Sequence, residues 1–106
     1  KECRELADLA EKYSDGEIRL TVEQNVILPN VDDGKVAELL AEPCVSGDSR
    51  MKVNPGFIEG NIVSCTGAEF CGLALVETKV NAERVAKKLE ELVTVDRPIR
   101  IHWTGW

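Results

Sequence analysis

Two cysteines, Cys65 and Cys71, lie where an apolar run gives way to a turn that contains Gly67 and Gly72. We expect this turn to join a strand to a helix, so that both thiols project from one loop. Thiolates are the usual ligands of iron–sulfur clusters, and the N-terminus of a following helix would favour a bound anionic cluster. The spacing is wider than in thioredoxin-type or zinc-ribbon pairs. Taken alone it is a weak signal, and a redox dithiol remains an alternative.

The first part of the chain predicts a helix, a strand pair and a second helix. Residues 3–13 place apolar side chains three and four positions apart, which is typical of an amphipathic helix. The runs 18–22 and 26–28 have β-type composition. Asp32 or Asp33 can cap a helix that ends before Pro43.

The second part predicts a strand, a loop, a helix and a strand. The strands are expected over residues 61–65 and 99–104. The helix between them would be capped by Asn81, with charged residues including Glu90 facing water. Its inward positions would be Val85, Leu89 and Leu92.

The helical crossover predicts that these two strands are parallel. Cys65 and Thr104–Gly105 would then meet at one edge of the sheet, which is where open α/β sheets place their ligands. The apolar run 73–76, which follows the cysteines, should be buried.

Composition limits the kinds of partner. The chain has 106 residues, 43% of them hydrophobic, and a net charge of -6. An acidic chain is a poor candidate for nucleic-acid binding or for an anionic membrane surface, and no run suffices for a transmembrane helix. Four cysteines also allow two disulfides, which leaves a disulfide-stapled domain with a Cys65–Cys71 bond as an alternative.

Three segments together resemble one enzyme family. Residues 64–79 closely resemble the first cluster motif of the ferredoxin-dependent nitrite reductases, and residues 97–105 look like the strand that leads into their second motif. Residues 18–30 resemble the strand pair that opens the second ferredoxin-like half of that family. The expected fold is α+β (α/β), a ferredoxin-like half-unit followed by a strand–loop–helix–strand cluster-binding subdomain. The expected domains are the half-domain segment 1–43, the linker 44–60 and the start of the siroheme/[4Fe–4S] domain, 61–106.

The resemblance implies cofactors and their ligands. The family couples a siroheme to a [4Fe–4S] cluster held by two cysteine pairs, and Cys65 and Cys71 match the first pair. The second pair would begin where Trp106 stands, so we expect a truncated site. Arg19 could contact a siroheme carboxylate or lie on a solvated strand face. Gln24 and Asn25 could bond the macrocycle edge or close a turn.

The resemblance also implies an activity for a parent enzyme. That enzyme would reduce nitrite to ammonium with electrons from ferredoxin, in plastids of plants and algae or in the cytoplasm of bacteria. We expect the isolated chain not to be competent without the missing half of the parent, and a fragment that binds no cofactor is an alternative. Two alternatives are a non-catalytic interaction module without cofactor and a segment of an assimilatory sulfite reductase.

Overall fold

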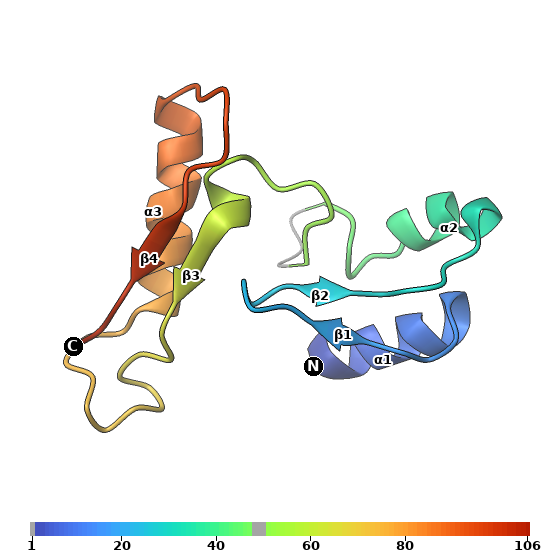
Figure 1. The fold of residues 1–106 in the computed structure, drawn as a ribbon, viewed down its shortest axis with the longest axis horizontal. Helices are drawn as coiled ribbons and strands as arrows, with labels where there is room; N and C mark the ends of the chain where they lie inside the picture. The colour runs from blue at the N-terminus through green and yellow to red at the C-terminus, as the bar shows by residue number, and fades with distance from the viewer. Residues whose placement is uncertain (1, 48–50) are drawn as a thin grey trace. The chain divides into compact units, whose positions relative to one another are not determined.

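The computed structural model describes residues 2–47 and 51–106, and the chain divides between Val53 and Asn54 into two compact units. Each unit combines helix with a two-stranded sheet (Figure 1), as the predicted α+β class requires. Residues 48–50 of the predicted linker lie outside the described residues. None of the described helices is long and apolar enough to cross a membrane.

The first unit begins with helix α1, Glu2–Tyr13, which buries Leu9, Ala10 and Tyr13 on one face. Backbone hydrogen bonds between the last turn of the helix and the residues that follow it mark the end of the helix. The carbonyl of Ala10 accepts the N–H groups of Ser14 at 3.0 Å and of Gly16 at 3.1 Å. Gly16 takes the positive φ of 83° that this ending needs, a conformation that glycine adopts at little cost.

Strands β1, Arg19–Leu20, and β2, Val26–Ile27, form an antiparallel hairpin that is shorter than predicted. The turn between them is closed by backbone bonds. The N–H of Gln24 donates to the Thr21 carbonyl at 3.1 Å, and the N–H of Thr21 donates to the Asn25 carbonyl at 2.9 Å. Gln24 has a φ of 63°, the left-handed position of such a hairpin turn.

The second helical segment consists of a 3₁₀ turn, η1 at Asp33–Lys35, continued by helix α2, Val36–Leu40. Asp32 occupies the N-cap of η1, but its side chain makes no capping hydrogen bond, so the predicted side-chain cap is wrong. The backbone carbonyl of Asp32 instead accepts the Lys35 N–H at 2.8 Å. Its carboxylate lies 3.9 Å from the Lys35 ammonium, which draws it away from the helix end.

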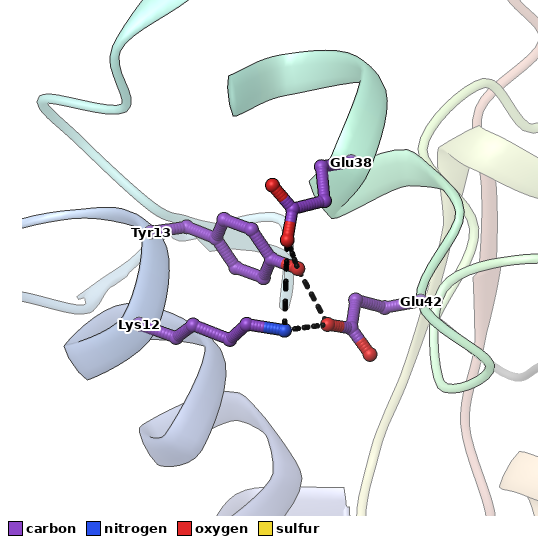
Figure 2. Close-up of polar contacts among 4 residues, drawn as sticks. All are labelled: Lys12, Tyr13, Glu38 and Glu42. Atoms are coloured by element: carbon purple, nitrogen blue, oxygen red, sulfur yellow. Dashed lines mark hydrogen bonds and ion pairs between the residues drawn. The ribbon is translucent and has the colours of Figure 1, made fainter. Parts of the chain in front are cut away.

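A polar cluster joins α1 to α2 (Figure 2). The Tyr13 hydroxyl lies 2.5 Å from a Glu42 carboxylate oxygen and 3.3 Å from one of Glu38, while the Lys12 ammonium lies 2.7 Å from Glu42. The hydrogen bonds from Lys12 and Tyr13 lower the pKa of Glu42. The hydrogen bond to Glu42 in turn raises the pKa of Lys12 and the pKa of Tyr13.

The second unit is a parallel strand pair with a helical crossover. Strand β3, Ile62–Ser64, pairs with β4, Ile101–Trp103, in the register Ile62 with Ile101 and Ser64 with Trp103. Helix α3, Lys79–Leu92, connects the two and packs on β3 (Figure 1). The predicted parallel arrangement is confirmed.

Helix α3 begins earlier than predicted and buries different side chains. Thr78 holds the N-cap, and Asn81 lies inside the first turn, where its side-chain amide donates to the Glu77 carbonyl at 2.7 Å. The helix buries Ala82 and Ala86, whereas Leu92 is 67% exposed, so its predicted inward position is wrong. Small side chains on this face let the helix backbone approach the sheet closely.

Glu90, predicted to face water, fixes the segment that precedes β3. Its carboxylate accepts the backbone N–H groups of Ile58 at 2.6 Å and Glu59 at 3.0 Å, at the start of the 3₁₀ turn η2, Glu59–Asn61. A carboxylate is well suited to donors left unpaired at the start of a helical turn. A Cβ at Gly56 would collide with this carboxylate, so the approach depends on that glycine.

We expect the Glu42 carboxylate to make the first unit sensitive to acid. Its folded pKa lies below the ordinary value of 4.5, so its contribution to stability is complete above that pH and is lost as pH falls through the folded pKa. Urea unfolding between pH 3 and 7, followed by the amide NMR signals of α1, should show a steep acid limb. Glu42→Gln should flatten that limb. An unchanged pH profile in Glu42→Gln would contradict the assignment.

Glu90→Ala should lower the free energy of unfolding by about 1–3 kcal/mol, because it leaves two backbone donors without their charged acceptor. Glu91→Ala is the matched control: Glu91 is exposed on the same helix and pairs with Lys88 at 3.0 Å. That change should stay within about 0.5 kcal/mol. Chemical denaturation followed by Trp fluorescence measures both, and equal losses would show that Glu90 has no special role.

Gln24→Gly should stabilise the hairpin by about 0.5–1 kcal/mol, because glycine relieves the left-handed strain of a side-chain-bearing residue. Val22→Gly in the same turn is the control, since Val22 is 91% exposed and its φ is not positive. It should destabilise through backbone entropy alone. Thermal unfolding monitored by the NMR signals of β1 and β2 distinguishes the two. A loss of stability in both variants would mean that the Gln24 side chain contributes more than its strain costs.

Candidate functional site: the cysteine loop at the edge of the parallel sheet

The loop that carries Cys65 and Cys71 lies against the end of strand β4. Cys65 follows β3 directly, and its N–H donates to the Trp103 carbonyl at 3.0 Å, which extends the parallel pairing by one step. Further along the loop, the N–H of Leu75 donates to the Gly105 carbonyl at 2.8 Å. Figure 1 shows the loop running beyond the same ends of both strands. The predicted meeting of Cys65 with residues 104–105 is confirmed.

Backbone hydrogen bonds fold the loop back on itself. The N–H of Cys71 donates to the Gly67 carbonyl at 3.0 Å, and the N–H of Ala68 donates to the Val76 carbonyl at 3.1 Å. Gly67 has a φ of 81°, and a Cβ there would lie 2.7 Å from the Thr78 hydroxyl oxygen. Both its backbone conformation and its neighbours therefore require glycine.

No helix follows Cys71 directly, which corrects the sequence-based expectation. The backbone groups of Leu75 and Val76 bond to Gly105 and Ala68, and this pairing is incompatible with a helix there. Helix α3 begins only at Lys79. Its first residues adjoin Cys65, because the Thr78 hydroxyl donates to the Cys65 carbonyl at 2.7 Å.

The apolar side chains of this loop are exposed, so the predicted burial of residues 73–76 is wrong. Leu73 is 81% exposed and Leu75 is 87% exposed, and Phe70 beside Cys71 is 78% exposed. The loop backbone is held at the sheet edge, while these side chains face away from the rest of the second unit.

The environment of Cys65 favours its thiolate. The hydrogen bond with Thr78, whose hydroxyl oxygen lies 3.7 Å from Sγ, is the main cause that lowers the pKa of the Cys65 thiol. The backbone N–H groups of Gly105 and Gly67 and the charge of Lys79 lower this pKa further, against the opposing effect of burial. The Lys79 ammonium lies 3.3 Å from the Ser64 carbonyl, just before Cys65.

None of the four cysteines forms a disulfide, so the disulfide alternative is not realised in this structure. Cys65 and Cys71 are half-buried, as is Cys44, whereas Cys3 is exposed. Across residues 2–47 and 51–106, no three or more His, Cys, Asp or Glu side chains gather as a metal site would need.

The other candidate residues belong to the hairpin of the first unit. Arg19 lies in β1, and its Nε is ion-paired with the Glu17 carboxylate, which raises the pKa of the guanidinium. Gln24 and Asn25 form part of the turn, where the Asn25 N–H donates to the Thr21 hydroxyl at 3.1 Å. The turn alternative for Gln24 and Asn25 accounts for their backbone; a cofactor contact by their side chains stays a prediction.

Sequence reasoning missed Thr78 and overlooked Lys79 as neighbours of Cys65. Thr78 is fully buried and Lys79 follows it at the first position of α3. A threonine immediately before a helical pattern is a recognised N-cap signal and could have placed the helix start here. Its contact with Cys65 could not be read from the sequence, because it depends on how the loop folds back.

Comparison with known proteins gives a consistent match. Residues 1–44 match the family model described as the nitrite/sulfite reductase ferredoxin-like half domain. The chloroplastic ferredoxin–nitrite reductase of Arabidopsis thaliana is 50% identical over 101 residues, which are 95% of this chain and 17% of that protein. The ferredoxin–nitrite reductase of Synechococcus elongatus is 48% identical over 95% of this chain and 19% of its own length.

A solved structure agrees with these sequence matches. The NirA protein of Mycobacterium tuberculosis superposes with a TM-score of 0.80 at 28% identity, over 94% of this chain and 19% of that protein. The chain thus spans less than a fifth of the length of the curated relatives it matches. The sequence matches cover both units and the structural match reproduces their fold, so nearly the whole chain is similar to a segment of nitrite/sulfite reductases.

Proposed function

We propose that the chain is a segment of a ferredoxin-dependent nitrite reductase and supplies two cysteine ligands, Cys65 and Cys71, to a [4Fe–4S] cluster. The observation that carries the proposal is the placement of both thiols on a loop tied by hydrogen bonds to the end of a parallel strand pair. Relatives named ferredoxin–nitrite reductase match nearly the whole chain. By that resemblance the complete enzyme reduces nitrite to ammonium, with ferredoxin as donor.

The residues at the sheet edge fit a cluster. Cysteine thiolates are the ligands that iron–sulfur clusters take, and neither Cys65 nor Cys71 is in a disulfide. Backbone N–H groups near the Cys65 sulfur stabilise the negative charge of its thiolate. When bound, a [4Fe–4S] cluster supplies one-electron transfer to a siroheme, the cofactor on which the family reduces nitrite. The remaining two thiolates would come from outside the described residues.

This chain's own residues would hold and orient the cluster. The β3–β4 pairing fixes the backbone of Cys65, and the Gly67 carbonyl accepts the Cys71 N–H at 3.0 Å, which closes the loop between the two cysteines. The Lys79 cation adds positive charge beside Cys65. The exposed apolar side chains of the loop would exclude water from one side of the site once covered.

We also propose that Arg19, Gln24 and Asn25 contact the siroheme. A guanidinium has five N–H donors, so the ion pair of Arg19 with Glu17 through Nε leaves donors for a carboxylate. Relatives from plants are named chloroplastic, which supports a plastid location if the chain comes from a plant or alga. For a bacterial source we propose a cytoplasmic location.

The test replaces the matching segment of the Arabidopsis thaliana enzyme with this chain and measures iron, acid-labile sulfide and nitrite consumption with reduced ferredoxin. The chimera should keep cluster and activity. Cys65→Ser and Cys71→Ser should each abolish both, because each removes a ligand. Cys3→Ser, at an exposed cysteine, is the matched control and should change neither.

Three outcomes would oppose the proposal. Full iron content in Cys65→Ser or Cys71→Ser would remove these residues from the ligand set. A folded, cluster-containing chimera that reduces sulfite but not nitrite would favour the sulfite reductase branch. A folded chimera without iron would favour an interaction module that has no cofactor.

A further inference from the structure

Thr78 occupies an unusual position beside the cysteine loop. It has no exposed surface, and among the described residues it is the largest side chain that is fully buried. Its hydroxyl donates to the Cys65 carbonyl at 2.7 Å, and the hydroxyl oxygen also lies 3.7 Å from the Cys65 sulfur. One hydroxyl therefore contacts both the backbone and the sulfur of the same cysteine.

Two neighbouring glycines leave the space that the Thr78 side chain occupies. A Cβ at Gly67 would lie 2.7 Å from the Thr78 hydroxyl oxygen, and a Cβ at Gly105 would lie 3.0 Å from the Thr78 methyl group. Two glycines from different strand ends thus leave room for this one side chain. Because Thr78 also starts α3, it joins the ends of β3 and β4 to the crossover helix.

The hydroxyl, more than the shape of the side chain, explains this arrangement. A buried site that needed only packing would be filled equally well by a valine, which has the same shape as threonine. The Cys65 carbonyl lies at the end of the strand, where the regular ladder stops, and an acceptor buried there without a donor is costly. A hydroxyl supplies that donor and fixes the direction in which Cys65 leaves the strand.

We propose that Thr78 is the positioning residue that holds Cys65 in place as a cluster ligand, through the hydrogen bond that its hydroxyl donates to the Cys65 carbonyl. The inference rests on the proposed function, because it needs Cys65 to be a ligand. Partners outside the ligand set that orient metal ligands commonly change metal affinity by about 10–100-fold when removed.

The test uses the chimeric Arabidopsis thaliana enzyme and compares Thr78→Ser with Thr78→Ala. Both changes remove the methyl group, so the two variants differ only in the hydroxyl. The readouts are the rate at which an iron chelator strips the cluster and the midpoint potential of the cluster. Thr94→Ala, at an exposed threonine in the loop after α3, is the control.

We expect Thr78→Ala to accelerate cluster loss about tenfold and to shift the midpoint potential, whereas Thr78→Ser and Thr94→Ala stay within about twofold of the parent chimera. Equal behaviour of the Ser and Ala variants would overturn the proposal, since only packing would then matter. If Thr78→Ala does not fold, Thr78→Val keeps the side-chain shape and must show the same acceleration. Loss of the cluster in Cys65→Ser together with no difference between Thr78→Ser and Thr78→Ala would reject this inference alone. Retention in Cys65→Ser would reject the proposed function itself.

Discussion

The parallel pairing of β3 with β4 is the constraint on which the second unit depends. Parallel strands cannot be joined by a tight turn, so the chain must leave β3, cross over through α3 and return beside it. That requirement puts the residues after both strands at one edge. Cys65, Gly105 and the start of α3 meet there, although they are far apart in the sequence. Backbone hydrogen bonds and the buried hydroxyl of Thr78 then hold the loop at this edge.

The two units are stabilised in different ways. The second unit packs a helix face of small residues, Ala82 and Ala86, on its sheet and uses Glu90 to satisfy the donors ahead of β3. The first unit buries Leu9, Ala10 and Tyr13 on one face of α1 and also links α1 to the α2 segment through the hydrogen-bonded group of Lys12, Tyr13 and Glu42 (Figure 2). A polar linkage of this kind titrates, which makes the first unit depend on pH. Both units also expose large apolar side chains, such as Leu20 on the hairpin and Leu75 on the cysteine loop. The relatives that this chain matches are several times longer, and further segments of such a protein could cover these apolar surfaces.

Periodicity was a sound guide to the types of the elements and a poor guide to their ends. It predicted α1 nearly residue for residue and the strand–helix–strand order of the second part, because apolar spacing reports directly on which face is buried. It placed the start of α3 three residues late, since Asn81 and Thr78 are both plausible caps and the choice depends on the neighbouring loop. It assigned Glu90 to solvent, because the donors that bind its carboxylate lie some thirty residues away in the sequence. It expected burial of residues 73–76 from their apolar character, and that failed because a backbone held at a sheet edge can turn its side chains outward.

The sequence by itself determined the chemistry that is available: two thiols on a glycine-containing loop, an acidic chain with few aromatic side chains, and motifs that resemble one family. Those properties are local, and spacing and residue type are enough to establish them. The tertiary structure alone decided that Thr78 is the neighbour of Cys65, that Gly67 and Gly105 make room for it, and that Lys79 lies beside the thiol. These contacts join segments that meet only after the crossover has formed. Which donor reaches the sulfur is set by the fold of the loop, and no local pattern encodes it.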